Sequence, residues 1–232
     1  IDLMRRVFIL RDEHELLGKE SAGLSHFAQL IEDIPTKEGR LSVLQELVNL
    51  FPDQAHFWGH LGRFYSIAMR DYDKAVEALD EAVRLCPEDP VLHHMRGMCY
   101  REKAITRMQQ LRTEEPSEKD TLEMEDLVDQ ALETFARARE IDPYQEHAYI
   151  APVQLLLRAL DFGFAISDCK SRADFLVSPS ARRYRLLLDK TENLMAAVRG
   201  IRAAEKPSRY VLDCQAHLDQ VYDDYSRALE GW

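Results

Sequence analysis

The sequence predicts an all-α protein built from antiparallel pairs of helices that stack along one axis. Three observations predict this fold. Apolar residues recur at helical spacing, and the pattern returns 35 residues later, from Gly62 to Gly97. The 232 residues include only 9 Gly and 9 Pro, which favours long helices over tight turns. Hydrophobic residues make up 46% of the chain, enough to build a core.

Composition also limits the function. The formal net charge of −11 argues against a general nucleic-acid binder, because phosphate contacts need a cationic surface. The cysteines Cys86, Cys99, Cys169 and Cys214 form no C-x-x-C pair, so we expect reduced thiols and a cytoplasmic setting. We find no 18-residue apolar run and no secretory signal, so no membrane segment is expected. Because the chain opens on Ile1, we expect a piece of a longer protein.

The first complete helix pair runs from Trp58 to Pro87. Its residues lie at helical spacing: Trp58, Leu61, Gly62 and Tyr65, then Ala75, Leu79, Ala82 and Pro87. The larger side chains of the first set share one helix face, and Gly62 leaves room for a second helix to lie close. Ala75 and Ala82 leave room from the other side, and Pro87 ends the second helix.

The second pair repeats these signals. Tyr100 follows Gly97 by three residues, and the second helix carries Ala131, Phe135, Ala138 and Pro143 at the same steps of four, three and five residues. Tyr100 to Ala131 spans 31 residues where Tyr65 to Ala75 spans ten, so 21 residues are inserted. We expect this insertion, roughly 105–127, to extend both helices around a loop at Pro116. Its charged centre predicts that it projects away from the core.

Weaker signals flank these pairs. Upstream, Arg40, Leu44, Leu47 and Pro52 reproduce the same steps, so residues 38–51 are expected to form the second helix of a degenerate unit. Residues 1–36 would then be a partly irregular connector. Downstream, Tyr144 to Asp168 would start a third pair, but it contains Pro152 and lacks the glycine. The repeats are therefore assigned to residues 37–168.

Residues 169–232 are expected to form a long helical hairpin that caps the array. Ser178 is a natural N-cap and Pro179 a first-turn proline, and the helix they open runs to about Ala204. Lys206-Pro207 breaks the pattern, and a last helix continues to about Leu229. A short turn should make these two helices pack antiparallel on each other.

The sequence of aromatic, Leu-Gly, Tyr, Ala, large residue, Ala and closing Pro resembles the tetratricopeptide repeat (TPR). The first pair departs from the family pattern by one extra residue, expected in the turn at 71–73. The resemblance covers about half the chain and implies a TPR-like α-solenoid that serves as a non-catalytic protein–protein interaction or sensor module. A looser resemblance, carried by segments 6–12, 27–33 and 56–65, is to regions following the NTPase module of STAND-type defence proteins, including bacterial relatives of the animal sterile-alpha-motif antiviral proteins.

The TPR resemblance implies a partner-binding groove on the first helix of each pair. The family's groove positions fall on His56, Gly59, His60, Arg63 and Ser66, then on Val91, His94, Met95, Met98 and Arg101, then on His147, Ile150, Ala151, Gln154 and Leu157. The candidate site consists of His56, His60, Arg63, His94, Met98, Arg101, His147 and Gln154. These side chains favour an acidic or phosphorylated protein partner, bound more strongly as pH falls from about 7.5 to 6. Other domains of the parent chain and self-association stay open, as does the alternative that an adjacent helix covers the groove.

Other chemistry has less support. No nucleotide-binding, nucleophile-elbow or zinc-protease motif occurs, so we expect neither an enzyme nor a cofactor. His56 and His60 have metal-ligand spacing without an evident third ligand, so no metal is assigned. The alternative function is nucleic-acid contact through the basic stretch 170–209, which holds ten basic against four acidic residues. Against it, Arg182, Arg183 and Arg185 face different directions of one helix.

Overall fold

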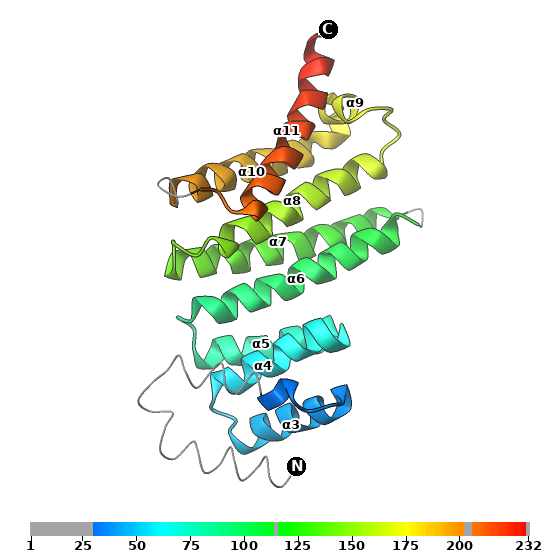
Figure 1. The fold of residues 1–232 in the computed structure, drawn as a ribbon. Coiled ribbons are helices and arrows are strands. Elements are labelled where there is room, and N and C mark those ends of the chain that lie inside the picture. Colours follow the sequence, from blue (N-terminus) through cyan, green and yellow to red (C-terminus); the bar gives the residue numbers. More distant parts are fainter. Residues whose placement is uncertain (1–29, 114–115, 202–205, 231–232) are drawn as a thin grey trace. The chain divides into compact units, whose positions relative to one another are not determined.

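The structure, a computed structural model, describes residues 30–113, 116–201 and 206–230, the last of these with side chains to Asp223. The ordered elements in these residues are helices joined by short connections, so the all-α prediction is confirmed (Figure 1). The helices pack into two units, divided between Cys86 and Pro87. The expected connector, residues 1–36, lies almost entirely outside the described residues. The boundary expected at 168/169 falls inside unit 2.

Unit 1 contains α3 (Lys37–Leu50), α4 (Ala55–Phe64) and α5 (Tyr72–Leu85). The helices α4 and α5 pair where Gly62 lies. A Cβ added at Gly62 would come within 2.5 Å of the Leu79 side chain and 3.0 Å of the Ala75 carbonyl oxygen. Such contacts are shorter than packed atoms allow, so the missing side chain permits the close approach.

The extra residue of the first pair is accommodated in a π-helical turn, not in the turn at 71–73 as expected. This turn, Tyr65–Met69, continues α4 without a break. The Arg70 amide donates to the Tyr65 carbonyl, five residues back, and Arg70 takes a left-handed conformation with φ of 55°. A π turn holds one residue more than the turn of an α-helix, so the length difference is absorbed before the connection to α5 begins.

Unit 2 begins with two long helices, α6 (Pro90–Leu111) and α7 (Glu118–Ile141). A Cβ at Gly97 would lie 2.8 Å from the Phe135 ring, so the second pair has the same close approach as the first. Both helices are longer than α4 and α5, as predicted for the insertion. The loop between them ends at Ser117, whose side chain and that of Asp120 form a capping box.

The expectation that the insertion projects from the core is wrong. Five of its apolar or flanking residues are buried in the core of unit 2: Ala104, Met108, Leu111, Met124 and Val128. The outer sides of the two helices, which carry most of the charge and the exposed Leu122, face solvent. The charge of this segment indicated exposure correctly at residues 117–119, but the apolar spacing on both sides of it records a buried face.

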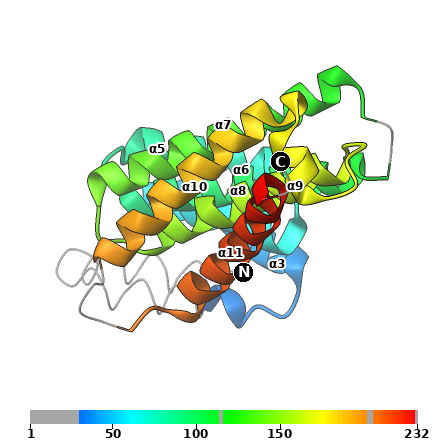
Figure 2. The same cartoon turned by 90° about the horizontal axis from the view of Figure 1, so that it is seen from above.

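A third pair consists of α8 (His147–Ala165) and α10 (Arg182–Ile201), with the short α9 (Arg172–Val177) in the connection. Their close approach uses Gly163, since a Cβ there would lie 2.3 Å from the Tyr184 ring. Pro179 opens a short 3₁₀ turn, and α10 begins at Arg182. Seen from above, α7 and α10 run alongside one another (Figure 2).

The helices α10 and α11 (Arg209–Glu230) do not form the expected closed hairpin. The apolar face of α10 is already buried against α8, and α11 packs mainly on α9 and α8. In Figure 1, α11 crosses α10 at a steep angle. The two helices still touch through the Arg199 and Gln215 side chains. The chain therefore turns back as predicted, but its last helix packs on other partners.

The residues that define the two repeats differ in how deeply they are buried. Ten are buried: Leu61, Gly62, Tyr65, Ala75, Leu79, Ala82, Gly97, Ala131, Phe135 and Ala138. Trp58 and Tyr100 are only half-buried, and the Trp58 indole N–H donates to the Pro52 carbonyl. Pro87 and Pro143 are exposed and lie two residues beyond the ends of α5 and α7. Each proline therefore follows its helix and does not pack within it.

The most apolar helix, α8, is the centre of unit 2. Its length and mean hydropathy of 1.2 would suit a membrane crossing, which corrects the expectation that no such run exists. However, 72% of this segment is buried inside the structure. Among the described residues it is the one helix that meets that criterion, and its burial marks it as a core helix.

Candidate functional site

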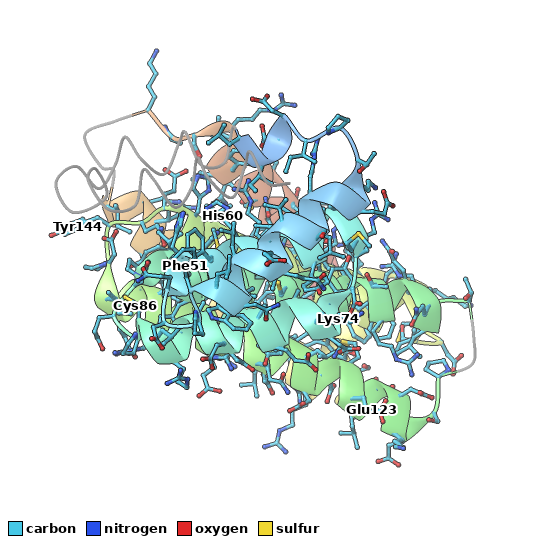
Figure 3. The ribbon with its side chains drawn as sticks, turned by 90° about the horizontal axis from the view of Figure 1, so that it is seen from below. Phe51, His60, Lys74, Cys86, Glu123 and Tyr144 are labelled. Atoms are coloured by element: carbon cyan, nitrogen blue, oxygen red, sulfur yellow. The ribbon has the colours of Figure 1, made fainter. Side chains whose placement is uncertain are left out.

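Three of the eight candidate groove residues belong to α4 of unit 1. His56 and His60 are half-buried with ring centroids 4.4 Å apart, and Arg63 is exposed. Burial, with smaller contributions from the neighbouring His56 and Arg63, lowers the pKa of His60 to about 3 (Figure 3). His60 is therefore neutral at pH 6, so it does not add positive charge between pH 7.5 and 6 as predicted.

The other five residues belong to unit 2 and come together on one face of α6 and α8. The Arg101 guanidinium donates to the Gln154 side-chain oxygen at 3.0 Å and approaches the Met98 sulfur at 3.8 Å. The rings of His94 and His147 lie 6.4 Å apart. We call these five residues, His94, Met98, Arg101, His147 and Gln154, the α6–α8 face.

His94 also fails the predicted pH response. Its ring packs 5.5 Å from that of Phe135. Burial lowers the pKa of His94 to about 4, with smaller contributions from His147 and Arg101. The imidazole is neutral above pH 5, so its role on this face is that of a packed polar ring.

The helix α11 packs against α8 and covers part of the α6–α8 face, the alternative left open from the sequence. Four buried residues form an apolar stripe along α11 at steps of three, four and three: Val211, Cys214, Leu218 and Val221. These residues share one core with α8. The groove predicted for a partner is therefore occupied in part, in unit 2, by a helix of the same chain.

Polar contacts fix α11 along the length of α8. Near the start of α8, the Ser208 hydroxyl donates to Glu146 at 2.5 Å. At the first residue of α8, the His147 ring lies 6.1 Å from the Tyr210 ring of α11. Towards the other end, His217 Nε2 lies 3.3 Å from an Asp161 carboxylate oxygen. Because these contacts follow the same order along both helices, α11 runs in the same direction as α8.

Asp161 is a functional candidate that the sequence analysis missed. Its carboxylate joins α8 to two other elements, since it binds Arg172 of α9 at 2.6 Å as well as His217 of α11. Burial alone would raise the pKa of Asp161, but His217 and Arg172 outweigh it and the pKa is lowered. The available signal was one acidic residue inside the apolar run 155–164.

Cys214 lies near enough to Arg101 for each to influence the pKa of the other. Gln154, the partner of Arg101, sits midway between Glu146 and Asp161 on α8, and Cys214 sits between Tyr210 and His217 on α11. Burial and the neighbouring Asp213 raise the pKa of the Cys214 thiol to about 11, and Arg101 opposes this rise. The Arg101 side chain is 17% exposed, and its Nε has no hydrogen-bond partner.

Two arginines of the basic stretch 170–209, Arg172 and Arg183, pair with acids from elsewhere in unit 2. Arg183 binds Glu125 at 2.8 Å and Asp129 at 3.0 Å, both on α7. Arg185 donates to the Leu176 and Ser178 carbonyls at the end of α9. Part of the local positive charge is thus compensated in space, while Lys170, Arg182 and Lys190 stay exposed, which weakens the nucleic-acid alternative.

No metal centre forms in the part of the chain that the structure describes, because no three His, Cys, Asp or Glu side chains gather there at ligand geometry. His56 and His60 lie close together, but no third candidate ligand joins them among the described residues. The arrangement of the described residues offers packing and hydrogen bonding.

The chain matches no family model. Among solved structures it is similar to the human IFIT1 dimer with m7Gppp-AAAA, at 17% identity and a TM-score of 0.47 over 83% of this chain and 51% of that one. A monomeric IFIT1 mutant with Gppp-AAAA gives 17% identity and a TM-score of 0.48, covering 84% and 51%. YrrB, a TPR protein with an unusual peptide-binding site, gives 16% identity and 0.42, covering 90% and 97%. The chain spans about half the length of the IFIT1 chains it matches.

Proposed function

We propose that this chain is a non-catalytic protein-interaction module whose α6–α8 face binds an amphipathic helix. The observation that carries the proposal is that this face already holds one, α11, through a continuous apolar stripe and polar contacts near its start and middle. Binding of a helix in a groove through anchors at steps of three and four is a recurring mode of peptide recognition.

The apolar anchors supply the affinity in this mode. Val211, Leu218 and Val221 are 7%, 3% and 2% exposed, so each gains nearly the full free energy of transfer from water. That gain is about 1.5–3 kcal/mol for a fully buried Val or Leu side chain. The polar contacts at Ser208 and His217 fix direction and register, since a shift by one turn would break both.

The proposal is tested with a chain that ends at Lys206 and a synthetic peptide of sequence Pro207–Glu230. We expect saturable one-to-one binding by isothermal titration calorimetry. A matched control peptide carries Val211→Asp and Leu218→Asp, which place charges in the apolar stripe and should abolish binding. Equal binding of both peptides, or of neither to a chain with native helical content, would contradict the proposal.

Nucleic-acid contact through residues 170–209 remains a lesser proposal. Lys170, Arg182 and Lys190 are exposed and supply some positive charge. The full chain should elute from immobilised DNA and RNA at low salt, because the arginines between them are paired with carboxylates or carbonyls. Salt-dependent retention would favour this second function.

We also propose a cellular context that rests on sequence resemblance alone. The module would work in the cytoplasm as part of a longer protein, and its partner would be another protein, a domain of the parent chain or a second copy. A STAND-type parent predicts a Walker loop encoded upstream in the same reading frame. A repeat array reaching the true N-terminus would contradict that parent.

A further inference from the structure

We propose that the α6–α8 face prefers a ligand helix with a carboxylate at the position that α11 fills with Cys214. On this account α11 is a displaceable occupant, and the partner is an acidic amphipathic helix that competes with it. The inference rests on the proposed function and specifies the chemistry of its ligand. The environment of Arg101 is the basis of this inference.

Arg101 is a buried cation with incomplete hydrogen bonding. Its two terminal nitrogens reach Glu102 at 2.8 Å and Gln154 at 3.0 Å, but its Nε is buried without an acceptor. A buried donor that loses its water and gains no partner costs free energy. His94, on the same face, has a buried Nδ1 that also lacks a partner.

Cys214, the residue of α11 near Arg101, is a poor acceptor for the unpaired Arg101 Nε–H. A cysteine thiol is a weak acceptor, and burial keeps the Cys214 thiol protonated at neutral pH. The adjacent Asp213 is exposed, so its carboxylate lies on the solvent side of α11. The anchors on either side, Val211 and Leu218, fit their apolar surroundings. The mismatch in this stripe is therefore local to Cys214.

A carboxylate at position 214 would provide the hydrogen-bond acceptor that Arg101 lacks. Its oxygens accept from guanidinium N–H groups in charge-assisted hydrogen bonds, which are roughly twice as strong as neutral ones. Arg158 adds positive charge, since it lowers the pKa of Arg101 together with burial, while Glu102 opposes both. Asp is close to Cys in size, so the change requires little repacking.

An external helix must compete with α11, which is covalently linked to the rest of the chain. A helix joined by a short link acts at an effective concentration on the order of millimolar, and it reduces the apparent affinity of a competitor by the fraction of open grooves. Weakening α11 without touching α6 or α8 should therefore strengthen the binding of an external helix. This gain distinguishes displacement from binding at another surface.

The test uses the full chain carrying Leu218→Ala, with Val211→Ala as a second way to weaken α11. Three fluorescent peptides of sequence Pro207–Glu230 have position 214 as Cys, or carry Cys214→Asp or Cys214→Val. We expect the Asp peptide to bind about tenfold more tightly than the Val peptide. All three should bind the wild-type chain more weakly. The matched control Leu212→Ala, on the exposed side of α11, should behave as wild type.

The role of Arg101 is tested by Arg101→Met in the Leu218→Ala chain, which keeps an unbranched flexible side chain and removes the guanidinium group. The preference for the Asp peptide should vanish or reverse. A preference that persists, or an Asp peptide no tighter than the Val peptide, overturns the inference while the proposed function stands. Failure of every peptide to bind any chain overturns the proposed function instead.

A second measurement applies even if no peptide binds. In the full chain, Cys214→Asp should give a higher melting temperature than Cys214→Val, and the order should reverse when Arg101→Met is added. An unchanged order in the two backgrounds overturns the inference, because the carboxylate would then gain nothing from Arg101.

Discussion

Arg139 of α7 donates a 2.7 Å hydrogen bond to the backbone carbonyl of Ala148 in α8. That carbonyl lies four residues before Pro152, which has no N–H to offer it. The guanidinium thus replaces the helical donor that the proline removed. It also lies 5.4 Å above the ring of Tyr149, whose hydroxyl donates to the Pro143 carbonyl. A proline inside a core helix is tolerated here because the neighbouring helix supplies the missing bond.

Replacing Arg139 by Met should therefore destabilise the chain by about 1–3 kcal/mol, the cost of an unpaired buried carbonyl. Pro152→Ala restores a backbone donor, so the same Arg139→Met change made in the Pro152→Ala chain should cost at least about 1 kcal/mol less. Urea unfolding of the four chains gives this coupling directly. Additive costs would show that Arg139 does not serve the Ala148 carbonyl.

The glycine at the α8–α10 crossing should not tolerate a methyl group. Gly163→Ala would place a Cβ 2.3 Å from the Tyr184 ring, and the resulting overpacking should cost about 1–3 kcal/mol. Gly200, in the last turn of α10, has nothing within 4 Å of an added Cβ. Gly200→Ala should instead stabilise by up to about 1 kcal/mol through helix propensity. Melting temperatures that move in the same direction would contradict the packing of this pair.

Truncating a side chain of the insertion should cost much more stability if that side chain faces the core than if it faces solvent. Leu111→Ala removes a fully buried side chain and should cost about 2–5 kcal/mol. Leu122→Ala removes one that is 56% exposed, and its effect should stay within about 0.5 kcal/mol. Chemical denaturation of both variants checks this. Equal, small effects would mean that the insertion lies outside the core after all.

The depressed pKa of His60 links stability to pH. The unfolded chain takes up a proton at His60 near its usual pKa of 6.5, whereas the folded chain does so only near 3. Stability from this group is therefore complete above about pH 6.5 and is lost as pH falls towards 3, by about 1 kcal/mol per unit. His60→Gln should reduce the slope of unfolding free energy between pH 6.5 and 4. Above pH 7 the two slopes should be equal, and equal slopes at low pH would refute the burial of His60.

The sequence predicted those parts of the fold that depend on local spacing. The steps from Ala75 to Pro87 and from Ala131 to Pro143 located α5 and α7, because helix ends and close contacts leave small residues and prolines at fixed positions. The π turn at Tyr65–Met69 could not be placed, since one extra residue fits either a wider helical turn or a longer connection. The glycine of the third pair was missed because Gly163 lies near the end of α8, where the repeat pattern has no glycine.

The site was harder to predict because it depends on which helices meet. The stripe from Val211 to Val221 shows that α11 buries one face, but the same stripe would suit packing on α10 or on α8. Nor do the steps that place His94 and Arg101 on one face of α6 reveal what covers that face. Desolvation of His60 and His94 likewise follows from neighbours distant in sequence, and so their titration could not be anticipated.

The central claim, that α11 is a docked but exchangeable occupant of the α6–α8 face, is tested most directly by the reactivity of Cys214. Thiol labelling of the full chain, resolved by peptide mass spectrometry, should modify the exposed Cys86 quickly and Cys214 slowly, since Cys214 is 3% exposed. An excess of the Cys214→Asp peptide, which has no thiol, should then accelerate the labelling of Cys214 in the chain without changing that of Cys86. Labelling of Cys214 as fast as Cys86 before peptide is added, or a Cys214 rate that saturating peptide does not change, would contradict the account.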